Sequence, residues 1–135
     1  MLYESITDYY NHDYGLSIFK LAIFIELYAE IILDKYYSSV GMNDDIKSSV
    51  LDLNKNWSQK IKPLKKIITT YLENEEVKLF QDSINNFEKN VRLPRNKFSH
   101  RSPLDWESAD TKEAFFSAFP IIWIFNKIEK VIDRA

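Results

Sequence analysis

The chain has 135 residues, which is enough for one folded domain with a single hydrophobic core. Apolar residues make up 45% of it and charged residues 28%, as in ordinary soluble globular proteins, and a formal net charge of −2 gives no overall attraction to nucleic acid. Because the chain has no cysteine, disulfides, thiolate catalysis and cysteine-based zinc sites are excluded, and the composition suits a reducing compartment, so we expect a cytoplasmic protein.

The first predicted helix runs from Leu16 to about Tyr37, after a lead-in at residues 1–14 of roughly one helical turn. Its charged residues fall on one narrow stripe, which consists of Lys20, Glu26, Glu30 and Asp34. Nearly all of the remaining helix surface is apolar. A helix of this kind either lies at the centre of a core or pairs with another chain.

The second predicted helix follows a break at residues 38–45, where Gly41 is placed as a C-terminal cap and Asn43 or Asp44 as an N-cap. Proline removes a backbone donor, so we expect Pro63 to kink or divide this helix. The apolar stripe expected to face the core consists of Ile46, Val50, Leu53, Trp57, Leu64, Ile67, Ile68, Tyr71 and Leu72.

The third predicted helix ends at residues 92–94, and its apolar stripe consists of Val77, Phe80, Ile84, Phe87 and Val91. Pro94 can begin a short helix, and residues 101–110 form a predicted loop. The last predicted helix starts at a capping box, Asp110 to Glu113, and runs to about Ile132 with a bend at Pro120.

This order of elements predicts an all-α protein, a single domain over residues 1–135 that forms an antiparallel bundle of four or five helices. Two apolar runs, at residues 15–33 and 114–125, are the candidates for insertion into a membrane. The first contains Lys20, Glu26 and Glu30, which are costly inside a bilayer, and the second is too short to span one. We expect both to be buried helices and expect no membrane partner.

Several groups of charged residues are expected to lie at the surface without a role in binding or catalysis. The acidic residues of the first helix have a spacing that suits a metal, but no histidine lies three residues after a glutamate, so we expect a solvated helix face and no metal or other cofactor. His12 is expected at the surface. The lysine cluster at residues 60–66 is expected to be a solvated face, with an auxiliary phosphate-binding patch as the alternative.

The segment from Lys89 to Arg101 differs from the rest, because it carries five basic side chains and no acid. Such a local positive region suits an anionic ligand. Arg95 offers a planar fork of donors that suits a phosphate, and the unperturbed pKa of a histidine side chain lies close to neutrality, so His100 suits proton transfer. Five positions apart on a helix, the two point about 140° from each other, but a long Arg95 side chain at the helix entrance can fold back towards His100.

The residues Arg95, Asn96 and His100, in "RNKFSH", resemble the R-x(4–6)-H motif of the HEPN superfamily, with its usual polar residue directly after the arginine. The all-α chain and the place of the motif between the third and the last helix are similar too. Members of this superfamily that are active are metal-independent ribonucleases, typically homodimers. The plain alternative is a helix start at Arg95 and Asn96, with His100 on the surface.

The resemblance implies a role for each motif residue. Arg95 would bind the scissile phosphate, His100 would act as general acid or base, and Asn96 would orient the site by hydrogen bonding. Attack by the ribose 2′-hydroxyl would leave a 2′,3′-cyclic phosphate. The neighbouring cations Lys97, Arg101 and Arg92 are the candidate substrate-binding residues.

The resemblance further implies an RNA substrate, a homodimer that brings together two histidines, and a role as a toxin of a toxin–antitoxin pair or as an anti-phage nuclease, with an antitoxin or other regulatory protein as a possible partner. The apolar first and last helices are the candidate dimer interface. Some toxins of this kind have a modified tyrosine two residues after the histidine, where this chain has Ser102, which implies a different inhibitor or subfamily. A catalytically inactive module that binds RNA or a protein is the other possibility.

Overall fold

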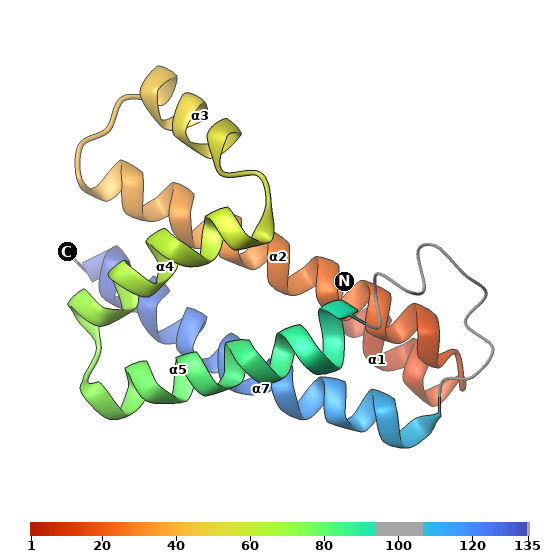
Figure 1. Ribbon diagram of the computed structural model, residues 1–135. Helices are drawn as coiled ribbons and strands as arrows, with labels where there is room; N and C mark the ends of the chain where they lie inside the picture. Colours follow the sequence, from red (N-terminus) through yellow and green to blue (C-terminus); the bar gives the residue numbers. More distant parts are fainter. Residues whose placement is uncertain (94–106, 135) are drawn as a thin grey trace.

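The computed structural model describes residues 1–93 and 107–134, and all regular structure within these ranges is helical (Figure 1). This confirms the all-α class. The described residues form six α-helices and one π-helical turn, so the predicted count of four or five helices is not confirmed. The elements are α1 (Leu2–Tyr10), α2 (Tyr14–Ser39), α3 (Asp44–Leu53), α4 (Trp57–Tyr71), α5 (Asn74–Phe87), the π-helix η1 (Glu88–Arg92) and α7 (Ser108–Arg134).

The two longest helices, α2 and α7, pack against each other and hold most of the core. They run parallel: Tyr28 of α2 contacts Asn126 of α7, and further along both helices Lys35 contacts Asp133. In contrast α5 runs opposite to α7, as Figure 1 shows. The expected antiparallel arrangement therefore describes α5 and α7 but not the central pair.

The N-terminal residues form a helix of nine residues, which is longer than the single turn expected from their weak periodicity. Two small buried residues hold α1 against α2: the hydroxyl of Ser5 donates to the carbonyl of Ser17 at 2.6 Å, and the hydroxyl of Ser17 donates to the carbonyl of Ser5 at 2.7 Å. Asp8 and Lys20 add an ion pair at 2.8 Å. Two serines are small enough to let α1 and α2 approach closely. The spacing of apolar residues does not indicate such a contact, which is why the helix was not predicted at its full length.

The break after α2 forms as predicted. Gly41 has a φ of 84°, a left-handed conformation that favours glycine, and the amides of Gly41 and Met42 donate to the carbonyls of Ser38 and Tyr37. Asn43 then caps α3, because its side chain accepts a hydrogen bond from the amide of Ile46 at 2.9 Å. Both predicted caps are confirmed.

The second predicted helix is divided, but not at Pro63. The chain breaks after Leu53, and Asn56 and Gln59 form a capping box that starts α4, so Pro63 lies within a continuous helix. The capping box at Asn56 starts a new helix there, and Pro63 does not end that helix. The part of the stripe on α3 was expected to face the core and does not: Ile46 is 52% and Leu53 is 74% exposed, while Trp57 is buried.

The helix α7 begins at Ser108, two residues before the predicted capping box. The carboxylate of Asp110 accepts a hydrogen bond from the amide of Glu107 at 3.1 Å, so Asp110 supports the helix start from its first turn instead of capping it. Pro120 lies inside the helix. Within residues 1–93 and 107–134, no helix combines the length and the apolar character that crossing a membrane requires.

Candidate functional site

Five of the six predicted site residues lie outside the described residues. Arg95, Asn96, Lys97, His100 and Arg101 belong to residues 94–106, which join Leu93 at the end of η1 to Glu107 before α7. Their proposed roles therefore stay predictions. The sixth residue, Arg92, and the helices on both sides of this segment can be described in detail.

Arg92 is held within the helical bundle. Its Nε donates to Glu26 of α2 at 3.1 Å, and its Nη1 lies 3.2 Å from Glu88, one turn earlier on its own helix. The guanidinium also lies over the ring of Trp57, 5.6 Å from its centroid. Its side chain is 18% exposed. Because two carboxylates and an aromatic ring already contact the guanidinium, this arrangement favours a structural role for Arg92, which ties η1 to α2 and α4.

The charged stripe of α2 differs from the solvated face that we expected. Its members form ion pairs with several other elements: Lys20 with Asp8 of α1, Glu26 with Arg92 of η1, Glu30 with Lys60 of α4, and Asp34 with Lys47 of α3. The stripe therefore locates the helices around α2. Within the described part of the chain, no group of three acidic, histidine or cysteine side chains is placed to hold a metal ion.

The lysine cluster at residues 60–66 and His12 also lie within the described residues. In the lysine cluster, Lys60 is buried and lies 3.4 Å from Glu30, while Lys62, Lys65 and Lys66 are exposed on α4. His12 is exposed, as predicted, in the turn between α1 and α2. Its φ of 62° is unusual for a residue other than glycine, and its Nδ1 lies 2.8 Å from the hydroxyl of Tyr14.

The turn that leads into the motif segment is a π-helix, which no pattern in the sequence indicated. The amide of Leu93 donates to the carbonyl of Glu88, five residues earlier, instead of four as in an α-helix. Such turns occur frequently at functional sites. Asn90, within this turn, donates from its Nδ2 to the hydroxyl of Ser117 on α7 at 2.9 Å, which joins η1 to α7.

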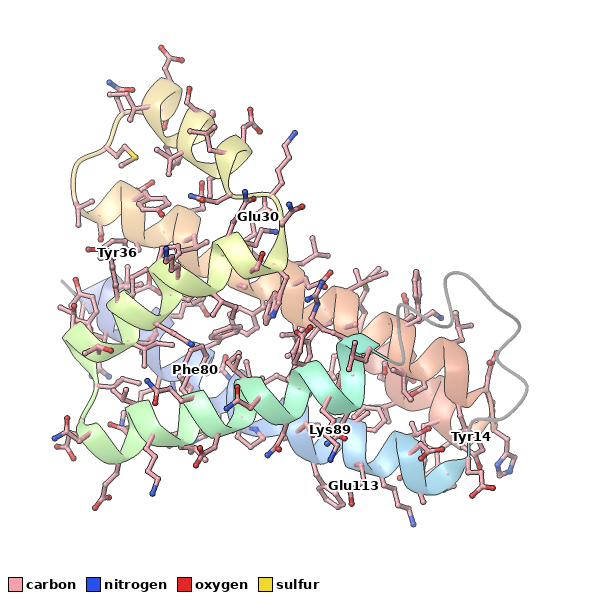
Figure 2. The ribbon with its side chains drawn as sticks, in the orientation of Figure 1. Tyr14, Glu30, Tyr36, Phe80, Lys89 and Glu113 are labelled. Carbon is pink, nitrogen blue, oxygen red and sulfur yellow. The ribbon has the colours of Figure 1, made fainter. Side chains whose placement is uncertain are left out.

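A polar hollow of about 470 Å³ lies beside this contact, between the end of α5, η1 and the first half of α7. Figure 2 labels the two charged residues of its lining, Lys89 of η1 and Glu113 of α7. The residues that line it are Asn86, Lys89, Asn90, Glu113, Phe116 and Ser117. Lys89 belongs to the basic segment that the sequence shows, but no sequence pattern marks Asn86, Asn90, Glu113 or Phe116 as residues of a site.

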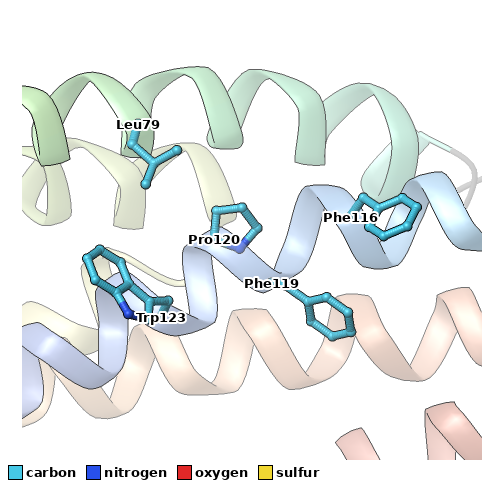
Figure 3. A pocket seen from close by; sticks show the side chains of 5 residues that line it. All are labelled: Leu79, Phe116, Phe119, Pro120 and Trp123. Carbon is cyan, nitrogen blue, oxygen red and sulfur yellow. The ribbon is translucent and has the colours of Figure 1, made fainter.

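A mostly apolar surface covers the outer side of α7. Phe116, Phe119 and Trp123 are 66%, 45% and 51% exposed, at helical spacings of three and four. Figure 3 shows them with Pro120, and with Leu79 of the neighbouring helix α5. We call these five residues the α7 aromatic surface. Large exposed aromatic side chains in one group typically mark a binding surface.

The chain was compared with protein-family models, with curated proteins and with solved structures, and none of them matches it. The likeness to the HEPN superfamily therefore rests on the motif and on the helical composition.

Proposed function

We propose that this chain is a metal-independent endoribonuclease of the HEPN type, folded as a HEPN-like helical bundle. The observation that carries the proposal is the sequence Arg95-Asn96-x3-His100 within a segment of five basic residues and no acid. In a chain with a net charge of −2, this segment is a local site for a polyanion. The all-α class and the place of the motif between two long helices support it.

The chemistry needs only groups that the motif and the substrate supply. Arg95 neutralises the scissile phosphate, and His100 moves a proton while the ribose 2′-hydroxyl attacks the phosphorus. The bond to the 5′-oxygen of the next nucleotide breaks, which leaves a 2′,3′-cyclic phosphate and a 5′-hydroxyl. Asn96 orients the site, and Lys97 and Arg101 bind the flanking phosphates. The contacts of Arg92 favour a different task, which is to anchor η1 at the start of the motif segment.

The transfer of two protons requires both an acid and a base, and the motif contains one histidine. We therefore propose that the enzyme is a homodimer in which two motifs share one cleft. Of the two helices considered as the interface, α2 exposes two large apolar side chains, Leu27 and Ile31, whereas α7 exposes the larger rings of the α7 aromatic surface. Within this surface, Phe119 and Trp123 are the better candidates for the dimer contact.

The test is the cleavage of single-stranded RNA by the purified chain in excess EDTA. We expect cleavage by the wild type and a loss of about 100-fold or more for His100→Ala and for Arg95→Ala. Lys55→Ala, which removes an exposed lysine outside both the motif segment and the lysine cluster, is the control and should cleave normally. Equal cleavage by all four proteins would identify a contaminant or another site.

The biological role that fits such an activity is a toxin of a toxin–antitoxin pair or a nuclease of anti-phage defence, restrained by an antitoxin or another regulatory protein. Expression of the wild type should then slow the growth of a bacterial host. The His100→Ala protein, at the same expression level, should relieve the effect. Equal inhibition by both would argue against a nuclease toxin.

The second candidate function is a non-catalytic module that binds a protein partner or RNA. The α7 aromatic surface favours it, because this much exposed aromatic area suits a protein contact without any chemistry. This candidate predicts that no RNA is cleaved and that partner or RNA binding survives His100→Ala but is lost in Trp123→Asp.

A further inference from the structure

The polar hollow between η1 and α7 has features of a binding site that the proposed catalytic motif does not use. Its charged groups come from different elements, Lys89 from η1 and Glu113 from α7. Within the described residues, neither has an ion-pair partner, although both line the same hollow. The carboxylate of Glu113 and the ammonium group of Lys89 line the same hollow and do not form an ion pair. Both groups are therefore available to a ligand that has hydrogen-bond donors as well as acceptors.

The hydrogen bonds at the hollow determine which atom of the Asn90 side-chain amide faces Ser117. Ser117 is buried, and its hydroxyl donates to the carbonyl of Glu113 at 2.8 Å. Its oxygen can therefore only accept from Asn90, so the Nδ2 of Asn90 is the donor at 2.9 Å. This leaves the Oδ1 of Asn90 as an acceptor. The π-helical turn places Asn90 and Lys89 on this side of the helix, next to α7.

An exposed aromatic ring completes the hollow. Phe116 is 66% exposed, and it lines both the polar hollow and the α7 aromatic surface. Flat rings of this kind stack on nucleobases with little preference for their identity. A volume of about 470 Å³ is in the range of small-molecule sites.

We propose that this hollow binds an unpaired guanine of the RNA substrate. Guanine is the base that presents two neighbouring donors, N1–H and the N2 amino group, which match the two oxygens of the Glu113 carboxylate. Its O6 and N7 are acceptors that suit the ammonium group of Lys89. Phe116 supplies the stacking surface. The choice of RNA as the source of the base rests on the proposed ribonuclease function, and the hollow adds a base preference to it.

The experiment measures nucleotide binding, which does not depend on cleavage. The full-length chain is titrated with guanosine 5′-monophosphate and adenosine 5′-monophosphate, and backbone amide shifts are followed by NMR. We expect the guanosine nucleotide to shift the amides of Asn86, Asn90 and Phe116 and to bind at least about tenfold more tightly than the adenosine nucleotide. Equal affinities, or shifts confined to other parts of the chain, would overturn the proposal.

Paired variants separate recognition from folding. Glu113→Gln should weaken guanosine binding by roughly five- to 150-fold and leave adenosine binding unchanged, because it removes one of two acceptors. Glu75→Gln, another exposed glutamate, is the control and should change neither. Phe116→Ala should weaken the binding of both nucleotides by a similar factor, whereas Tyr3→Ala, at an exposed aromatic ring of α1 outside the hollow, should not.

Cleavage mapping then distinguishes the two proposals from each other. If RNA is cleaved next to guanine by the wild type and without this preference by Glu113→Gln, both stand. RNA cleavage with no base preference in the wild type would overturn the guanine site and leave the nuclease. Guanosine binding that Glu113→Gln abolishes, together with no RNA cleavage, would support the binding site and contradict the nuclease.

Discussion

Arg92 shows how a basic side chain in a promising segment can serve the fold. Its contacts with Glu26, Glu88 and Trp57 occupy both the charge and the flat face of the guanidinium. Removing this guanidinium would break the ion pairs with both carboxylates and the contact with the Trp57 ring at once, so η1 would lose its ties to α2 and α4. The distinction between Arg92 and the other cations of the segment can be tested.

We predict that Arg92→Ala lowers the free energy of unfolding by about 1 to 3 kcal/mol, as measured by urea unfolding. The control Lys62→Ala, at an exposed position of α4, should change it by less than about 0.5 kcal/mol. If Arg92→Ala unfolds like the wild type and instead weakens RNA binding, then Arg92 belongs to the substrate site.

Tyr28 gives the fold a dependence on alkaline pH. Burial, together with the charge of Glu129 and a hydrogen bond to it, raises the pKa of Tyr28 from 10.0 to about 12. The folded chain thus holds this proton more tightly than the unfolded chain, so Tyr28 stabilises the fold below pH 10, and this contribution is lost as the pH rises from 10 to about 12.

We predict that the wild type loses stability to urea over this pH range and that Tyr28→Phe loses less. Part of the loss should remain in the variant, because ion pairs raise the pKa values of Lys20, Lys35 and Lys47 as well, and these pairs also weaken in alkali. The tyrosinate absorbance should contain a component near pH 12 that is absent in Tyr28→Phe. Burial also raises the pKa of Tyr37, and that component should remain in the variant. Identical stability profiles would contradict the assignment.

At the scale of elements, α3 is attached differently from its neighbours. None of its residues is buried, and in Figure 1 it projects from the bundle beside the end of α2. Lys47 connects it to α2 through Asp34 at 3.2 Å and through the hydroxyl of Ser38 at 3.0 Å. Exposed ion pairs contribute little to stability, so α3 should be the least stable helix of the described chain.

We predict that the amide hydrogens of α3 exchange with solvent at least about tenfold faster than those of α2 and α7 under native conditions. Hydrogen exchange followed by NMR or mass spectrometry checks this, with α4 as the internal comparison, since it follows α3 in the chain and has buried residues. Equal protection in α3 and α2 would mean that something covers the exposed stripe of Ile46 and Leu53.

The sequence predicts elements well where local chemistry decides them. Gly41 and Asn43 act within one or two residues, so the end of α2 and the start of α3 could be predicted from residue type. The apolar spacing also located α2, α5 and the core residues Phe80, Ile84 and Phe87. These features depend on neighbours in the chain.

The parts that could not be predicted depend on contacts between distant residues. The reciprocal bonds of Ser5 and Ser17 hold α1 against α2, and Ile46 and Leu53 of α3 are exposed because no helix of the described residues packs over them. The π-turn and the hollow beside it follow from how η1 meets α7, through Asn90 and Ser117. Of the candidate site, the motif and Lys89 could be found from the sequence, but the residues that α7 contributes could not.

For the whole molecule, the proposed mechanism requires two chains. We predict that the wild type is a dimer by sedimentation or light scattering and that Trp123→Asp, which places a charge in the α7 aromatic surface, is a monomer with little or no cleavage activity. The control is Leu53→Asp, at an exposed apolar residue of α3, which should remain dimeric and active. A wild-type monomer that cleaves RNA would show that one chain is sufficient.

The proposed function also predicts which group of the RNA attacks the phosphate and which ends the products carry, and a residue with a purely structural role would not affect either. If the ribose 2′-hydroxyl is the nucleophile, the nucleotide before the cut must carry it, and the product must end in a cyclic phosphate. A substrate with a single 2′-deoxy nucleotide at a mapped cleavage position separates this chemistry from attack by water.

The most direct measurement is therefore mass spectrometry of the products from a matched pair of oligonucleotides, all-ribose and singly 2′-deoxy, treated in EDTA with the wild type and with His100→Ala. We predict 2′,3′-cyclic phosphate and 5′-hydroxyl ends from the all-ribose RNA with the wild type, no cut at the 2′-deoxy position, and no products with His100→Ala. Cleavage at the 2′-deoxy position, or undiminished cleavage by His100→Ala, would contradict the proposed ribonuclease.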